Sequence, residues 1–188
     1  MSYFKSRRSA VVARNGSVAT SQPLAAQAGL QMLRDGGNAI DAAVATAAVL
    51  NVVEPMSTGI GGDMFALIWD KNERKVVSLN GSGRQAAAAN VDDVRNAGYE
   101  SIPNNGAGSH FAVSVPGTVH GWDTALIQYG RMTLKEVLQP AIDYALNGYA
   151  VSEVIAHGWG GADTITKLNH RPSGQELCAN QSVKRPET

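Results

Sequence analysis

The 188-residue sequence predicts an α+β fold in which helices pack on an antiparallel sheet. Two apolar stretches with helical period follow one another between residues 22 and 51. Two short strand-like runs then flank a polar turn at residues 70–74, which predicts a β-hairpin. A further helical pattern with a clear start signal occupies residues 133–147. We expect the hairpin to pack under the first two helices.

The first helix is predicted from apolar residues that recur at intervals of three and four: Ala25, Ala28, Gly29, Met32 and Leu33. Pro23 suits the first turn, where its missing N–H leaves no hydrogen bond unmade. Ser21 and Gln22 are the candidate caps, and Ser21 has the better capping chemistry. Gly36 and Gly37 should end the helix, because the position after a helix commonly needs positive φ.

The second helix should begin at Asn38, whose side chain can cap it, with Asp41 in its first turn. Residues 40–50 are almost all apolar and rich in alanine, so this helix should be buried and closely packed. The apolar run has about a dozen residues, short of the roughly 20 that span a membrane. We interpret Asp41 as a helix-start residue in preference to an acid catalyst.

The hairpin strands are predicted at residues 64–69 and 75–79. The glycine-rich loop at residues 57–62 precedes a strand and lacks the Lys-Ser/Thr pair of a phosphate-binding loop, so a structural turn is the preferred interpretation. Asp63 at the end of this loop is interpreted as a turn or capping carboxylate, with a ligand role as the alternative.

Other elements are expected from weaker patterns, namely short strands at 9–13 and 110–115 and helices at 91–97, 118–129 and 154–168. Thr133 and Glu136 form a capping-box pair at the start of the 133–147 helix, and Pro140 should kink it. Trp122 and Trp159 are expected to be packing aromatics.

Composition limits the function classes. The 16 basic and 16 acidic residues balance, so charge gives no drive towards nucleic acid. The four histidines show no metal spacing, and Cys178 has no evident partner, so no metal, cofactor or catalytic thiol is implied. No signal peptide and no membrane segment is visible, which favours the cytoplasm while leaving the compartment open.

Five blocks occur in an order and spacing that together are specific: GGNAIDAAVA at 36–45, VVEP at 52–55, GIGGDMF at 59–65, PGTVHGW at 116–122 and QPAIDYALNGY at 139–149. With these blocks the sequence resembles the gamma-glutamyltranspeptidase family. The resemblance implies an N-terminal nucleophile hydrolase, with an αββα sandwich formed after a precursor cleaves itself into large and small subunits.

The resemblance also implies a reaction. Such enzymes cleave a gamma-glutamyl amide, as in glutathione, and pass the acyl group to water or an amine. The nucleophile is the first Thr of the small subunit, with its own amine as base. The similarity covers residues 9–151, the early part of a large subunit, and 152–188 form a poorly defined tail of one incomplete domain over 1–188. We therefore expect no catalytic residue in this chain, and a small subunit or C-terminal remainder as its partner.

One substrate-binding residue is implied by the resemblance. The family's large subunit supplies an Arg, just after the second hairpin strand, that binds the substrate α-carboxylate. Arg84 is the candidate here, although counting from the strand end places the usual position on Ser82. The Pro that usually follows is replaced in the run Gln85-Ala86-Ala87. A solvated loop cation is the alternative interpretation of Arg84.

Two other functions are open. Because Arg84 is displaced from the usual position, the first alternative is a related acylase or amidase, such as a cephalosporin-acylase-like enzyme that acts on a different acyl group. The other alternative is a truncated, non-catalytic binding or structural protein. In every case we expect the chain alone to expose apolar surface that the rest of the sandwich should cover.

Overall fold

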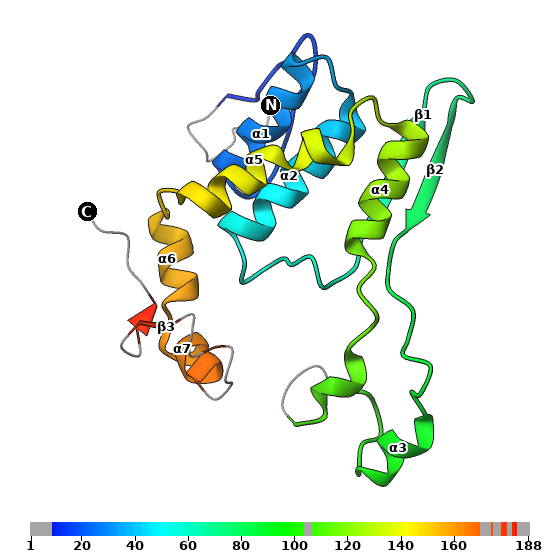
Figure 1. Ribbon diagram of the computed structural model, residues 1–188, viewed down its shortest axis with the longest axis vertical. Helices are drawn as coiled ribbons and strands as arrows, with labels where there is room; N and C mark the ends of the chain where they lie inside the picture. Colours follow the sequence, from blue (N-terminus) through cyan, green and yellow to red (C-terminus); the bar gives the residue numbers. More distant parts are fainter. Residues whose placement is uncertain (1–8, 104–106, 170–173, 175–177, 180–181, 184–188) are drawn as a thin grey trace, which may run out of the picture.

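The computed structural model describes residues 9–103, 107–169, 174, 178–179 and 182–183. Helices α1, α2 and α5 form one group, with α4 and a β-hairpin at its side and α3 beyond them (Figure 1). The elements in chain order are α1 (Pro23–Arg34), α2 (Ala39–Val53), β1 (Phe65–Asp70), β2 (Lys75–Asn80), α3 (Val91–Asn96), the 3-10 helix η1 (Ala107–Ala112), α4 (Thr118–Tyr129), α5 (Leu134–Asn147), α6 (Glu153–Trp159), α7 (Ala162–Asn169), β3 (Cys178–Ala179) and β4 (Ser182–Val183).

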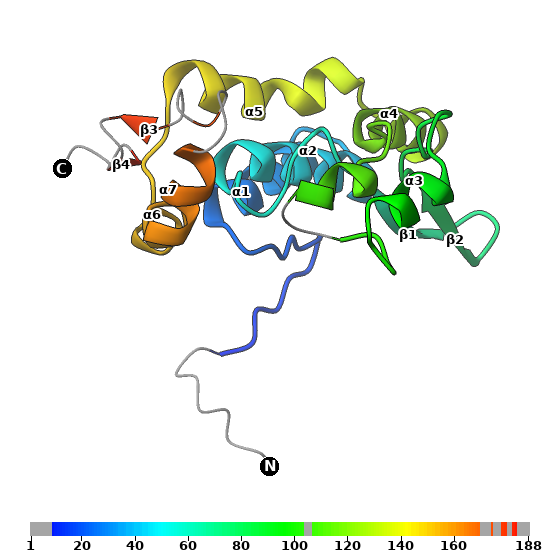
Figure 2. The same ribbon diagram turned by 90° about the horizontal axis from the view of Figure 1, so that it is seen from below.

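The core lies around α2, which packs against α1 and α5 and is central in both views (Figures 1 and 2). Val49 and Val53 of α2 and Val137 of α5 are fully buried. The backbones of α1 and α2 approach closely at Gly29, where an added Cβ would lie 2.2 Å from Thr46 Oγ1. The alanine-rich, buried character that the sequence predicts for α2 is thus confirmed.

Of the two candidate caps of α1, Ser21 and Gln22, the structure uses the one that the capping chemistry ranked second. Gln22 is the cap, because its Oε1 accepts the Leu24 N–H at 2.7 Å. The Ser21 hydroxyl donates instead to Glu54 Oε2 at 2.6 Å. A long-range partner therefore takes Ser21 away from the local cap, and it ties the start of α1 to the end of α2.

Asp41 joins the start of α2 to the turn between α4 and α5. Its Oδ2 accepts the Asn38 N–H at 2.6 Å, which completes a capping box with the Asn38 side chain. Its Oδ1 accepts the N–H groups of Arg131 and Met132 at 3.0 and 3.1 Å. Asn38 Nδ2 also donates to the Tyr129 carbonyl at 2.6 Å. The helix-start role of Asp41 is confirmed, and it is joined by a tertiary role with the side chain fully buried.

The hairpin is antiparallel, with Phe65 opposite Asn80 and Asp70 opposite Lys75. It lies beside α4, which β2 contacts, so the expectation that it packs under α1 and α2 is wrong. Backbone hydrogen bonds between its base and the start of α4 fix this position. Ile68 is buried on its inner face, whereas the outer face exposes large apolar side chains: Phe65 (67%), Leu67 (80%), Trp69 (62%) and Val76 (60%).

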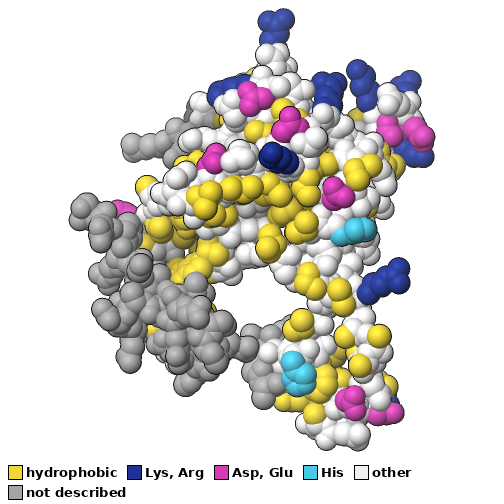
Figure 3. Space-filling view, in the orientation of Figure 1, with side chains coloured by type: hydrophobic (Ala, Val, Ile, Leu, Met, Phe, Trp, Pro, Cys, Tyr) yellow, Lys and Arg dark blue, Asp and Glu magenta, His cyan; other side chains and the backbone are white. Residues whose placement is uncertain are grey.

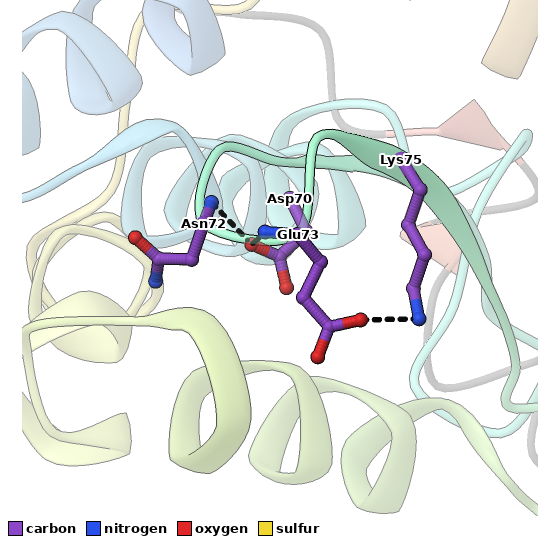
Figure 4. Close-up of polar contacts among 4 residues, drawn as sticks. All are labelled: Asp70, Asn72, Glu73 and Lys75. Atoms are coloured by element: carbon purple, nitrogen blue, oxygen red, sulfur yellow. Dashed lines mark hydrogen bonds and ion pairs between the residues drawn. The ribbon is translucent and has the colours of Figure 1, made fainter.

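The hairpin turn is held by Asp70, whose Oδ1 accepts the N–H groups of Asn72 and Glu73 at 2.8 and 3.2 Å (Figure 4). An ion pair between Glu73 and Lys75 lies beside it. Arg74 has a positive φ of 52°, as a tight turn requires. The polar turn that the sequence predicts is therefore confirmed.

The capping box of α5 is also confirmed. The Thr133 N–H and hydroxyl donate to Glu136 Oε2 at 2.7 and 2.6 Å, and the Glu136 N–H donates to Thr133 Oγ1 at 3.3 Å. The hydrogen bonds from the Thr133 hydroxyl and then from its backbone N–H hold the pKa of Glu136 below its usual value. Helix α5 continues through Pro140, so the proline does not end it.

Three weaker predictions need correction. Residues 9–13 form no strand, and Val11 and Val12 are 90% and 93% exposed because no described strand lies alongside them. Helix η1 replaces the first half of the strand expected at 110–115, and the second half forms an isolated bridge between Gln85 and Ser114. The helix expected at 154–168 is divided into α6 and α7 around residues 160–161. Most of the 170–188 tail is outside the described residues.

Apolar surface stays exposed, as expected. Hydrophobic side chains gather over the helical group on the face seen in Figure 3. In α5, Ile142 and Leu146 are 41% and 77% exposed. Within the described ranges, no helix is long and apolar enough to cross a bilayer.

Asp41→Asn should lower the free energy of unfolding by about 2–3 kcal/mol, because an NH₂ group would then face backbone N–H donors in a buried site. Urea denaturation followed by circular dichroism measures this change. Asp143→Asn is the control: Asp143 is exposed on α5 and accepts one bond from Gln139, so its replacement should change stability by less than about 0.5 kcal/mol. Equal effects of the two variants would contradict the role of Asp41.

Candidate functional site

Three segments meet at the base of the hairpin, and we call their meeting point the glycine junction: residues 62–64, 81–84 and 114–118. The first two continue the hairpin ladder, since the Gly81 N–H donates to the Met64 carbonyl at 2.7 Å and the Met64 N–H donates to the Gly81 carbonyl at 3.2 Å. The N–H groups of Gly117 and Thr118 both donate to the Gly62 carbonyl at 3.1 Å. The junction therefore ties the hairpin to the start of α4.

Glycine is required at two positions of the junction. A Cβ on Gly83 would lie 1.4 Å from the Val115 carbonyl oxygen, and a Cβ on Gly117 would lie 2.3 Å from the Gly81 carbonyl oxygen. Both obstacles are backbone atoms of hydrogen-bonded residues, since the Gly81 carbonyl accepts from Met64 and the Val115 N–H donates to Arg84, so they cannot move away cheaply. The sequence marks these glycines as parts of separate motifs, but it gives no sign that they meet.

Asp63 links two of the segments. Its Oδ1 accepts the Gly83 N–H at 3.2 Å and the Ser114 hydroxyl at 3.2 Å. The hydrogen bonds of Asp63 therefore join segments 20 and 51 residues away in the chain, which differs from the local turn or capping role that the sequence predicts. Sequence reasoning missed Ser114, because nothing in the local pattern around it indicates a partner so far along the chain.

Arg84 lies at the edge of the junction with its side chain exposed. Its carbonyl accepts the Val115 N–H at 2.8 Å, so the backbone at this residue is held. Among the described residues its guanidinium makes no ion pair. Such a group on a fixed backbone can bind a carboxylate through two parallel hydrogen bonds.

Ser82 stands where the family's Arg is expected. Its hydroxyl and its N–H both bond to Asn80 Oδ1, at 2.7 and 3.0 Å. The Asn80 side chain at the end of β2 therefore holds Ser82, which offers no charge to a substrate. The available cation is two residues further along, beyond the close contact at Gly83.

Other candidate groups are dispersed. His110 lies against Phe111 with ring centroids 4.0 Å apart, and Trp122 is buried in the core, as expected. His170 is outside the described residues, as is the side chain of Cys178. In the parts of the chain that the structure describes, no three His, Cys, Asp or Glu side chains are grouped as metal ligands.

The sequence of this chain is similar to a known protein family and to several of its members. The profile of the family described as gamma-glutamyltranspeptidase matches residues 25–187. The glutathione hydrolase-like YwrD proenzyme of Bacillus subtilis is 45% identical over 142 residues, which are 76% of this chain and 26% of that protein. The Acylase ACY 1 proenzyme of Pseudomonas sp. is 40% identical over 148 residues, 76% of this chain and 26% of that protein.

Solved structures agree. The gamma-glutamyltranspeptidase of Helicobacter pylori superposes with a TM-score of 0.83 at 30% identity, over 94% of this chain and 50% of that one. The cephalosporin acylase of Bacillus halodurans superposes with a TM-score of 0.78 at 48% identity, over 89% of this chain and 31% of that one. The fold is thus the α+β class of the N-terminal nucleophile hydrolases.

The chain belongs to the gamma-glutamyltranspeptidase family. It spans about a quarter of the length of the curated relatives it matches. The resemblance seen in the five sequence blocks is confirmed, and those blocks lie in α2, in two of the three segments of the glycine junction and in α5.

Gly83→Ala should lower the free energy of unfolding by about 1–3 kcal/mol, because the new methyl group cannot fit against Val115 without moving backbone. Gly61→Ala is the matched control, since an added Cβ there meets nothing within 4 Å. Thermal or urea denaturation of both variants measures the difference. If the two variants were equally stable, the close packing at the junction would be disproved.

Proposed function

We propose that this chain is part of an enzyme that cleaves a gamma-glutamyl amide and passes the acyl group to water or an amine. Family membership carries the proposal, together with relatives such as the glutathione hydrolase proenzyme of Bacillus subtilis, which is 38% identical over 146 residues. The nucleophile would come from sequence that the relatives have beyond the matched quarter. The present chain would supply the scaffold and one substrate contact.

That contact is Arg84. Its guanidinium is exposed, and its backbone is held by Val115 at the glycine junction. A gamma-glutamyl group carries an α-carboxylate, and arginine is suited to bind one through paired charged hydrogen bonds. Arg84 would orient the substrate without touching the bond that breaks. Orientation of this kind contributes mainly to KM when the contact is the same in the ground state and the transition state.

A related acylase activity is the second candidate, and one observation favours it. Ser82 occupies the position expected for the family's carboxylate-binding Arg, and its hydroxyl is engaged with Asn80. The similarity to Acylase ACY 1 and to a cephalosporin acylase of 48% identity supports the same candidate. Such an enzyme would use the same fold with an acyl group other than gamma-glutamyl.

The exposed face of the hairpin favours the presence of a partner segment in the natural protein. It is a two-stranded sheet with a large apolar outer face, and an isolated hairpin of this kind is marginally stable in water. We expect a further sheet to cover this face, supplied by a small subunit or by the remainder of a precursor. Several relatives are named proenzymes, which fits a precursor that is cleaved.

Arg84→Ala should raise KM for a gamma-glutamyl amide by about tenfold to a hundredfold with little change in kcat, as expected for one lost charged hydrogen-bond pair. The measurement uses the natural protein that contains this chain. It compares a gamma-glutamyl amide with the matched amide that lacks the α-carboxylate, for which the variant should make no difference.

Arg95→Ala is the control for this measurement, because Arg95 is an exposed arginine of α3 that pairs with Asp92. Its KM should equal that of the unmodified protein. An unchanged KM in Arg84→Ala would remove Arg84 from the site. A preference for the amide without the α-carboxylate would favour the acylase candidate.

The intact mass of the natural gene product should change on incubation from one species to two, whose masses sum to that of the first plus one water. The reason is that an N-terminal nucleophile is released only when the peptide bond before it is cut. Mass spectrometry before and after incubation measures this directly. A single unchanged mass in a product that is nonetheless active would contradict the family mechanism.

A further inference from the structure

We propose that Asp63 is a positioning residue, which fixes the backbone from which the Arg84 side chain reaches a substrate. The inference rests on the proposed function of Arg84. It identifies the side chain that holds the backbone beside Arg84 in position. It also explains how a cation displaced by two residues from the expected position can still be held in one orientation.

The backbone before Arg84 is intrinsically flexible. Gly81 and Gly83 flank Ser82, and glycine loses more conformational freedom on ordering than any other residue. Gly83 cannot be exchanged for a stiffer residue, because it packs against the Val115 carbonyl, and a Cβ on Gly81 would lie 3.0 Å from Gly121 and from the Met64 carbonyl, so these neighbours would have to shift. Rigidity in this segment must therefore come from hydrogen bonds.

Two hydrogen bonds bracket Arg84. On one side the Gly83 N–H donates to Asp63 Oδ1 at 3.2 Å, and on the other the Arg84 carbonyl accepts the Val115 N–H at 2.8 Å. The first bond fixes the peptide group between Ser82 and Gly83, and the second fixes the peptide group between Arg84 and Gln85. With both in place the direction of the Cα–Cβ bond of Arg84 is set. With only the second, the peptide group before Gly83 loses its hydrogen-bonded restraint, and the close packing against Val115 is left to hold it.

Asp63 also holds the opposite segment. The same Oδ1 that accepts from Gly83 accepts the Ser114 hydroxyl at 3.2 Å, and Ser114 pairs with Gln85 in an isolated bridge. One carboxylate oxygen thus keeps residues 83–85 against residues 114–115. The contact needs an acceptor at this place, and it does not need a negative charge.

Asp70 offers a matched control within the same hairpin. One of its carboxylate oxygens also accepts two hydrogen bonds, in this case from the backbone N–H groups of Asn72 and Glu73 in an exposed turn (Figure 4). It lies at the far end of the hairpin from the glycine junction. Replacing Asp70 therefore has a similar local cost without moving Arg84.

The experiment uses the natural protein that contains this chain, with the variants Asp63→Ala, Asp63→Asn, Arg84→Ala, Asp63→Ala with Arg84→Ala, and Asp70→Ala. KM and kcat are measured for a gamma-glutamyl amide. Amide hydrogen exchange is measured at Gly83 and Val115, which reports the backbone directly and needs no turnover.

We expect Asp63→Ala to raise KM about three- to tenfold with kcat little changed, which corresponds to one ordinary hydrogen bond. Exchange at Gly83 and Val115 should become faster. Asp63→Asn should restore both values, because its amide oxygen can still accept. In the Arg84→Ala background, the loss of Asp63 should add nothing further to KM. Asp70→Ala should leave KM and both amides as they are.

The outcomes separate the two proposals. If Arg84→Ala raises KM while Asp63→Ala changes neither KM nor exchange, the positioning role is overturned and the role of Arg84 stands. If Asp63→Ala raises KM equally with and without Arg84, Asp63 acts by another route and the inference also fails. If Arg84→Ala has no effect on KM, the proposed role of Arg84 is wrong and the positioning role falls with it, even where exchange at Gly83 rises.

Discussion

The buried carboxylate of Asp41 is the interaction on which the rest of the structure depends. It accepts hydrogen bonds from the backbone N–H groups of Asn38, Arg131 and Met132, so one side chain completes the start of α2 and holds the turn between α4 and α5. A charge in this place is tolerated because every oxygen has donors. The consequence is that α5 lies along α2 and α4 leaves the core at a fixed point.

The start of α4 in turn holds the glycine junction in position. The start of α4 donates two backbone hydrogen bonds to Gly62, and the base of the hairpin is paired across Met64 and Gly81. The hairpin is therefore attached to the start of α4 by hydrogen bonds, and its apolar outer face is exposed. The helical core thus holds a loop with the exposed Arg84 beside a sheet whose outer face is uncovered.

Local sequence patterns predicted those parts of the fold whose cause is local. The Asn38 cap, the Thr133–Glu136 capping box and the hairpin turn each involve residues close in the chain, and each was predicted correctly. The patterns failed where a distant partner competes. Ser21 binds Glu54 and leaves the cap to Gln22.

The candidate site shows the same division. The sequence alone indicated the family, which the comparisons confirm, because the five blocks follow from residue order. Residue order is also the basis for proposing Arg84 as the substrate-binding cation, two residues beyond Ser82. Only the tertiary structure decided that Asp63 and Ser114 meet beside Arg84. The physical reason is that hydrogen bonds across tens of residues depend on how the core places each segment, and no local propensity encodes that placement.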